Sequence, residues 1–150
     1  MSDELKRAKH QAIHLLSLRD HSRKELADKV TRQHEVSDSE LDGLLDELEA
    51  SGYLSDQRYA EMFMRSSLIR GHGPMKITYA LRNKGVDDEL VREAFDSSDT
   101  DWLEHARYQR EKKFGEEIPE DFKERARQSR FLAGRGFYID TINAVFHEEC

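Results

Sequence analysis

The chain of 150 residues contains little cysteine, little proline and no long hydrophobic run. Its one cysteine, Cys150, excludes a disulfide framework and indicates a reducing compartment. No apolar run approaches the ~18 residues that a membrane-spanning helix needs, and residues 1–9 lack the hydrophobic segment of a signal peptide. We therefore expect a cytoplasmic protein that has no membrane among its partners.

Large aliphatic and aromatic side chains are also scarce. Leu, Ile, Val and Phe together account for 33 residues, or 22%, whereas charged residues make up 37%. A hydrophobic content this low is close to the level at which chains stop burying a core. The composition therefore favours several small cores placed side by side over one large globular core.

The sequence patterns of enzyme active sites are missing as well. There is no glycine-rich phosphate loop, no zinc-type cysteine and histidine spacing, and no nucleophilic serine at a strand-to-helix elbow. His10 and His14 lie one helical turn apart, but they face away from the apolar side of the first helix and lack a third ligand. We therefore expect no enzyme activity, no catalytic residue, no cofactor and no metal site.

Helix boundaries, by contrast, are well marked along the whole chain. No alternating pattern typical of a strand persists for more than a few residues. Ser22–Glu25 and Ser37–Glu40 are predicted capping boxes, and Ser55 is a predicted helix N-cap. The segment Ile118–Glu120 is expected to open the eighth of nine helices. Turns and helix ends are expected at Gly71, Gly73, Pro74, Gly85 and Gly136.

The helices recur in groups of three. Two copies of the hydrophobic pattern align without a gap at a spacing of 51 residues. Ile77, Leu81, Gly85, Val86, Val91, Ala94 and Phe95 align with Gln128, Leu132, Gly136, Phe137, Ile142, Val145 and Phe146. A first copy joins with one extra residue and contributes Leu26, Val30, Val36, Leu41, Leu44 and Leu45. Self-similarity at a regular spacing is the signature of a repeat architecture.

The predicted fold is therefore all-α, with three tandem three-helix repeats at residues 4–53, 54–98 and 99–150. Each repeat can bury a small core, and neighbouring repeats add a modest interface. We expect an elongated, curved body with the character of a right-handed repeat protein.

Charge is distributed unevenly along the chain. The net charge of −7 argues against a simple nucleic-acid binder. Five basic residues and no acidic one lie between Met62 and Lys84, however, whereas nine acidic residues and only one basic residue lie between Glu35 and Glu61. The average charge therefore conceals separate basic and acidic segments.

The middle helix of each predicted repeat is basic, and two interpretations compete. Basic and acidic helices could stabilise each other through exposed pairs, each contributing only ~0–1 kcal/mol. Alternatively, the basic helices could line one side and bind a phosphate backbone or an acidic polymer. On the second interpretation the binding residues are Arg23, Lys24, Arg65, Arg70, Lys76, Arg82, Lys84, Arg127, Arg130 and Arg135.

Four motifs in order carry a family resemblance. They are His21–Leu26 (HSRKEL), Ser51–Ala60 (SGYLSDQRYA), Gly71–Val86 (GHGPMKITYALRNKGV) and Arg130–Phe137 (RFLAGRGF), the last followed by Ile142. In this order and spacing the chain resembles the RecX family. It departs from the family pattern at Ser55, where aspartate is common; since serine also caps helices well, the fold is unaffected.

The resemblance implies a bacterial regulator that binds the RecA–DNA filament and limits its extension, thereby modulating recombination, DNA repair and the SOS response. It implies the same three-repeat fold and no catalytic residues. We expect a monomer whose partner is the RecA filament, with single- or double-stranded DNA as a further partner. The alternatives are a helical module that binds DNA directly and an adaptor that holds a basic partner on its acidic faces.

Overall fold

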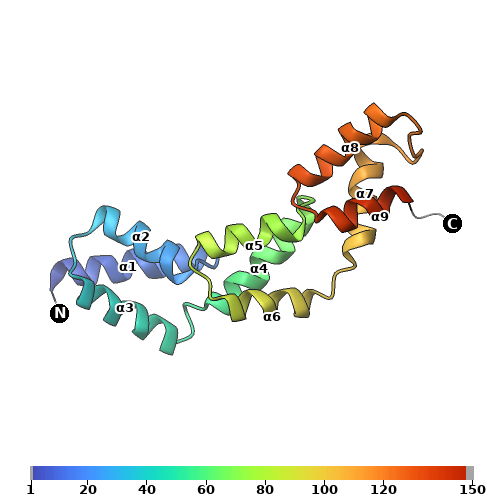
Figure 1. The fold of residues 1–150 in the computed structure, drawn as a ribbon. Coiled ribbons are helices and arrows are strands. Elements are labelled where there is room, and N and C mark those ends of the chain that lie inside the picture. The colour runs from blue at the N-terminus through green and yellow to red at the C-terminus, as the bar shows by residue number, and fades with distance from the viewer. Residues whose placement is uncertain (1, 148–150) are drawn as a thin grey trace. The chain divides into compact units, whose positions relative to one another are not determined.

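The computed structural model describes residues 2–147, which form nine α-helices and no strand in that range (Figure 1). They are α1 (Asp3–Leu18), α2 (Arg23–Gln33), α3 (Asp38–Ala50), α4 (Asp56–Ile69), α5 (Pro74–Asn83), α6 (Asp88–Ser98), α7 (Trp102–Phe114), α8 (Phe122–Gly134) and α9 (Ile139–His147). The all-helical prediction is confirmed. Cys150 lies outside the described residues. None of the described helices is long and apolar enough to span a membrane.

Local side chains determine where the helices begin. The Ser37 hydroxyl accepts the backbone N–H of Glu40 at 3.1 Å, and the Glu40 carboxylate accepts that of Ser37 at 3.0 Å. This reciprocal pair is the predicted capping box of α3. The Ser55 hydroxyl accepts the N–H of Arg58 at 3.1 Å, which confirms the predicted cap of α4.

Two predicted helix starts were wrong in detail. The Ser22 hydroxyl caps α2, but the Glu25 carboxylate pairs with the Arg19 guanidinium at 2.7 Å instead of completing a capping box. Helix α8 begins at Phe122, after the segment Ile118–Glu120. The reason is Asp121, whose carboxylate accepts the N–H of Glu124 at 3.1 Å, whereas a helix that begins at Pro119 would have Ile118, a poor N-cap, before it.

The described chain divides into two compact units. Among the described residues, the N-terminal unit contains 2–63 together with 81–94, and the C-terminal unit contains 64–80 together with 95–147. In the N-terminal unit α2 packs against α1 and α3 (Figure 1). Its core is built from Ala8, Ala12, Leu26, Val30, Leu41, Leu44, Leu45, Leu48 and Leu54.

The C-terminal unit has a separate core. Helices α7, α8 and α9 pack against one another in all three pairings (Figure 1). Their buried apolar residues are Ala106, Leu132, Phe137, Ile142, Val145 and Phe146, with Trp102, Leu103 and Phe131 partly buried against them. Each of the two units therefore has a small core of its own, in keeping with the low hydrophobic content.

Most residues that align in the predicted repeat are buried in the structure. Leu81 and its counterpart Leu132 are fully buried, and both members of most other aligned pairs are buried as well. Both copies end the helix on a glycine with positive φ, 79° at Gly85 and 98° at Gly136. The following N–H then bonds to the carbonyl five residues earlier, at 3.1 Å and 3.2 Å respectively. This is the hydrogen bond of a Schellman helix end.

Candidate functional site

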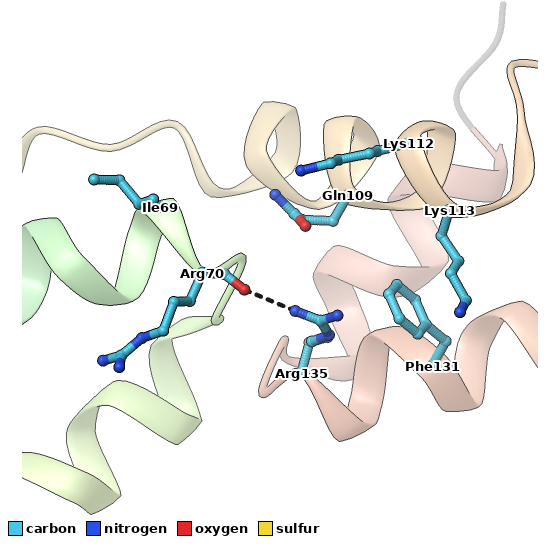
Figure 2. Close-up of a pocket in the computed structure, with 7 residues that line it drawn as sticks. All are labelled: Ile69, Arg70, Gln109, Lys112, Lys113, Phe131 and Arg135. Carbon is cyan, nitrogen blue, oxygen red and sulfur yellow. Dashed lines mark hydrogen bonds between the residues drawn. The ribbon is translucent and has the colours of Figure 1, made fainter.

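Four positive side chains line one pocket of the C-terminal unit, between the end of α4, the C-terminal half of α7 and the end of α8 (Figure 2). The pocket has a volume of about 240 Å³. It is lined by Ile69 and Arg70 at the end of α4, Gln109, Lys112 and Lys113 in α7, and Phe131 and Arg135 at the end of α8. None of these seven described residues is acidic. We call this site the basic pocket.

The arginine of α8 is held firmly in the basic pocket. Its Nη1 donates to the Arg70 carbonyl at 2.7 Å (Figure 2). The Arg135 guanidinium also lies 4.9 Å from the centre of the Phe131 ring, and the Lys113 ammonium lies 5.7 Å from it. Figure 2 shows the ring between these two cations. Phe131 in turn makes an edge contact with Phe114, at 5.3 Å between ring centres.

Close backbone contact brings Arg70 and Arg135 together. The Gly73 N–H donates to the Arg135 carbonyl at 2.7 Å, and the Met75 N–H donates to the Gly136 carbonyl at 2.9 Å. A Cβ on Gly73 would lie 2.6 Å from the Gly136 carbonyl carbon, so a side chain there would force the two segments apart. The predicted turn residues thus join the start of α5 to the end of α8, and Pro74 is buried at that join.

The remaining predicted cations of the C-terminal unit lie outside the basic pocket. Arg65, Lys76 and Arg130 are exposed on α4, α5 and α8. Arg127 forms an ion pair with Glu124 at 2.9 Å and lies over the Phe114 ring. Of the six predicted binding residues in this unit, the structure brings only Arg70 and Arg135 together in the basic pocket.

In the N-terminal unit, Arg23 is surrounded by acidic residues of α3. Its guanidinium lies 2.8 Å from Asp46, 2.9 Å from Glu49 and 3.8 Å from Asp42. These are the contacts expected if neighbouring basic and acidic helices stabilise each other. Arg23 therefore has strong internal partners that a binding role would have to displace.

Lys24, Lys84 and Arg82 lie around the end of α5. The Lys24 ammonium donates to the Asn83 carbonyl at 3.1 Å, and Lys84 lies 3.7 Å from the buried Glu25 carboxylate. A Cβ on Gly85 would lie 2.8 Å from the Lys24 Cβ, which indicates how closely these segments pack. Arg82 pairs with Asp88 at 2.9 Å, with both side chains more than half exposed.

The structure also contains a buried arginine that the sequence analysis missed. Arg110 is fully buried, and burial lowers the pKa of its guanidinium. It donates to the Gln128 side-chain oxygen at 3.1 Å and to the Glu116 and Glu117 carbonyls at 3.1 and 3.3 Å. The signal was available, because Gln128 occupies the repeat position where the previous copy has the fully buried Ile77.

Two histidines of the C-terminal unit connect α7 to the turn before α5. The His105 Nε2 lies 3.1 Å from the His72 carbonyl oxygen. In the tautomer with its proton on Nε2, His105 donates a hydrogen bond to that oxygen. The His105 ring also packs between Trp102 and Phe137, at 5.8 and 5.5 Å between ring centres. Burial lowers the pKa of both His72 and His105. Within the described chain no group of three or more His, Cys, Asp or Glu side chains is arranged to hold a metal.

Comparison with known proteins covers nearly the whole chain. Family models for the first, second and third three-helix domains of RecX match residues 8–48, 55–94 and 99–146. The chain is 40% identical over 135 residues to the regulatory protein RecX of Halorhodospira halophila, covering 89% of this chain and 83% of that one. Identity to the RecX of Chromohalobacter salexigens is also 40%, over 98% and 96% of the two chains.

The fold has a solved counterpart at lower sequence identity. A crystal structure of RecX from Lactobacillus salivarius matches with a TM-score of 0.80 at 22% identity, over 97% of this chain and 96% of that one. At this identity the match concerns the fold, and the curated relatives give the family. The chain therefore belongs to the RecX family of regulatory proteins and is built of three three-helix domains.

Proposed function

We propose that this chain regulates the RecA recombinase by binding the RecA–DNA filament and limiting its extension. The observation that carries the proposal is family membership, since the three RecX domain models match in order and curated RecX proteins align over 89% or more of the chain. Through the filament the chain would modulate recombination, DNA repair and the SOS response in the bacterial cytoplasm.

The charge distribution supports binding to a nucleoprotein in spite of the net charge of −7. Attraction to a polyanion depends on the local potential, and the basic pocket is lined by four positive side chains and by no acidic residue. Such a protein acts by occupying its partner's surface, so it needs no catalytic group of its own.

The direct test is the DNA-dependent ATPase activity of RecA. We expect strong inhibition when this chain is present at well below one molecule per RecA, because a block on extension affects every subunit that would have been added later. Inhibition that appears only near one-to-one stoichiometry would argue against a block on filament growth. No inhibition at any ratio would contradict the proposed function.

A gel-shift comparison separates the proposal from its two alternatives. Binding to RecA–DNA filaments in strong preference to naked DNA supports the regulator. Equal binding to both supports a helical module that binds DNA directly, and binding to neither supports an adaptor for a basic partner. All three outcomes can be read from one titration against the two substrates at a single salt concentration.

Charge reversal at Arg82 tests whether the end of α5 takes part. Arg82 is exposed and pairs only at the surface, so Arg82→Glu leaves the core of the N-terminal unit intact. Lys84→Glu is a poorer choice, because it would place a second carboxylate beside the buried Glu25. We expect Arg82→Glu to weaken RecA inhibition, whereas Arg92→Glu, an equal change of charge at an exposed position of α6, should not. Equal inhibition by the two variants would exclude this surface.

A further inference from the structure

We propose that Lys29 of α2 is a site of covalent acylation by small acyl phosphates, with His21 as its proton acceptor and the adjoining cavity as the binding site for the acyl donor. The inference goes beyond the proposed function, because it concerns a chemical modification of the chain itself. It stands on three features of the N-terminal unit: a cavity between α1 and α2, a hydrogen bond between Lys29 and a buried imidazole, and the exposed cation of Arg32 in the cavity wall.

The cavity lies between the packed helices α1 and α2 and has a volume of about 270 Å³. Its lining residues are Gln11 and Leu15 of α1, and Lys29, Arg32 and Gln33 of α2. On each helix the later positions follow the first by three or four residues, so they share one face. The Gln11 Nε2 donates to the Gln33 Oε1 at 2.8 Å, which links the two helices at the cavity. The lining therefore offers two cations, two amides and one aliphatic side chain.

The hydrogen bonds of His21 determine which ring nitrogen carries the proton. The ring is almost completely buried, and its Nδ1 lies 3.1 Å from the Arg19 carbonyl oxygen, which can only accept. Nδ1 therefore carries the proton, and Nε2 accepts from the Lys29 ammonium at 2.9 Å. Burial lowers the pKa of His21, which keeps the ring neutral near pH 7. A base thus lies within hydrogen-bond reach of a primary amine, as in activated nucleophiles.

A simpler explanation is that Lys29 only satisfies the buried imidazole or pairs with Glu25. The Glu25 carboxylate, however, already accepts from the Arg19 guanidinium through both oxygens, at 2.7 and 3.2 Å, and lies 4.0 Å from the Lys29 ammonium. The closer partner of the ammonium is therefore the imidazole. A donor with a purely structural role could be fully buried, whereas the Lys29 side chain is 32% exposed and lines the cavity. A reagent in solvent can therefore reach the amine.

The residues that line the cavity favour an acyl phosphate as the donor. The phosphate group is an anion, and the planar fork of N–H groups on the Arg32 guanidinium suits its oxygens. The aliphatic side chain of Leu15 offers an apolar contact for a short acyl group. An uncharged acyl donor would gain nothing from Arg32, so the two kinds of reagent can be told apart.

The reaction moves the acyl group from a phosphate oxygen to the Lys29 nitrogen. The ammonium passes one proton to the His21 Nε2, and the nitrogen lone pair attacks the acyl carbon. The C–N bond forms and the C–O bond to phosphate breaks, so that phosphate leaves with that electron pair and takes the second proton of the amine. His21 then releases its proton to water. The product amide keeps one N–H for His21, and α2 loses one positive charge.

The test measures how fast each lysine of the full chain reacts with acetyl phosphate. The reaction is run at a pH of about 8, where imidazole is neutral, and acetylation is quantified over time by peptide mass spectrometry. We expect Lys29 to react about tenfold faster than the exposed Lys6 and Lys123, below the ~10²–10⁴ that a positioned base contributes in enzymes. A rate equal to or below that of Lys6 and Lys123 would overturn the proposal and leave Lys29 a structural role only.

Two histidine variants test the proton acceptor. His21→Gln removes the acceptor of the Lys29 proton, whereas His10→Gln changes an exposed histidine of α1 and serves as the control. We expect the rate of Lys29 to fall to that of the exposed lysines in His21→Gln and to remain unchanged in His10→Gln. An unchanged rate in a folded His21→Gln variant, as judged by circular dichroism, would exclude His21 as the acceptor.

Arg32→Gln tests the donor site even if the buried His21 cannot be replaced without unfolding. Arg32 is exposed, so the core of the N-terminal unit stays intact, and Arg92→Gln at an exposed position of α6 is the matched control. With acetyl phosphate we expect Arg32→Gln alone to slow the acetylation of Lys29 severalfold. With the uncharged N-hydroxysuccinimide ester of acetic acid neither variant should differ from wild type. No effect of Arg32→Gln on the first reagent, or an equal effect on both reagents, would overturn the assignment of the donor site.

Discussion

Replacing the buried Arg110–Gln128 pair by apolar residues should cost much less stability than the two single replacements suggest. Gln128→Ile removes an acceptor from a buried guanidinium whose Nε already lacks a hydrogen bond. Losing a hydrogen bond to a charged group costs about 1.5–3 kcal/mol, and the remaining charge stays buried. Arg110→Met removes all three acceptor contacts and leaves the Gln128 oxygen without its partner.

The double variant, Arg110→Met with Gln128→Ile, leaves neither the buried guanidinium nor the buried amide behind. It recreates at position 128 the apolar residue that the preceding copy has at Ile77, with methionine filling the space of the arginine stem. Buried ionic groups replaced together by apolar residues of similar volume often cause no loss of stability. We therefore expect the two single costs to exceed the cost of the double variant by about 2 kcal/mol, within the usual range for residues in contact.

The assay is urea unfolding followed by fluorescence. Trp102 is the only tryptophan, and it packs against the core of α7, α8 and α9, so its signal reports on the C-terminal unit. A control cycle uses exposed lysines of the same helices, Lys112→Met and Lys123→Ile, and should be additive within about 0.5 kcal/mol. If the Arg110 and Gln128 variants were equally additive, the pair would not be energetically coupled and the reasoning would be refuted.

Three further predictions concern stability. Gly136→Ala should cost about 1–3 kcal/mol, since residue 136 has φ of 98° and a Cβ would lie 2.5 Å from the Lys76 Cβ. Gly43→Ala should stabilise the chain by about 0.5–1 kcal/mol, because residue 43 lies inside α3 with open space around it. Thermal unfolding should therefore show a lower melting temperature for the first variant and a higher one for the second. Ser55→Ala should lower the free energy of unfolding by about 1 kcal/mol because it removes the N-cap of α4, whereas Ser55→Asp, which also caps well, should leave it almost unchanged. Thermal melts followed by circular dichroism measure both, and equal losses of stability would show that this cap does not matter. Burial lowers the pKa of His105 and His72, so the folded chain resists protonation while the unfolded chain takes up protons near pH 6.5. The midpoint of urea unfolding should therefore fall as the pH drops from about 7 towards 5.5. The fall should be less steep in His105→Gln, and a midpoint independent of pH would contradict the prediction.

Local sequence signals were sufficient for most of the fold. The helix starts at Ser37 and Ser55, and the helix ends at Gly85 and Gly136, depend on hydrogen bonds within a few residues. The 51-residue spacing of hydrophobic positions also identified the buried residues, because burial on a helix follows its periodicity. At Ile118–Glu120 the prediction was wrong, since a proline signal competed with a better cap two residues after it.

The composition of the basic pocket was not accessible in the same way. Lys112 and Lys113 are in the last turn of α7, a position that helix-end charge alone explains. Their proximity to Arg135 depends on how α7 packs against α8, which no local pattern encodes. Likewise, Arg23 resembles other basic residues in the sequence, and only packing of α2 on α3 shows that three carboxylates surround it.

The join between Gly73 and Gly136 depends on the absence of a Cβ atom at both positions and on main-chain N–H and C=O groups, which every residue except proline possesses. Its two hydrogen bonds use the carbonyls of Arg135 and Gly136, so replacing the side chains of Met75 or Arg135 leaves the bonding groups in place. The surface beside the join can therefore change its ligand chemistry while the join itself persists. In this chain the side chain of Arg135 in the basic pocket is free to vary, whereas Gly73 and Gly136 at the join are not.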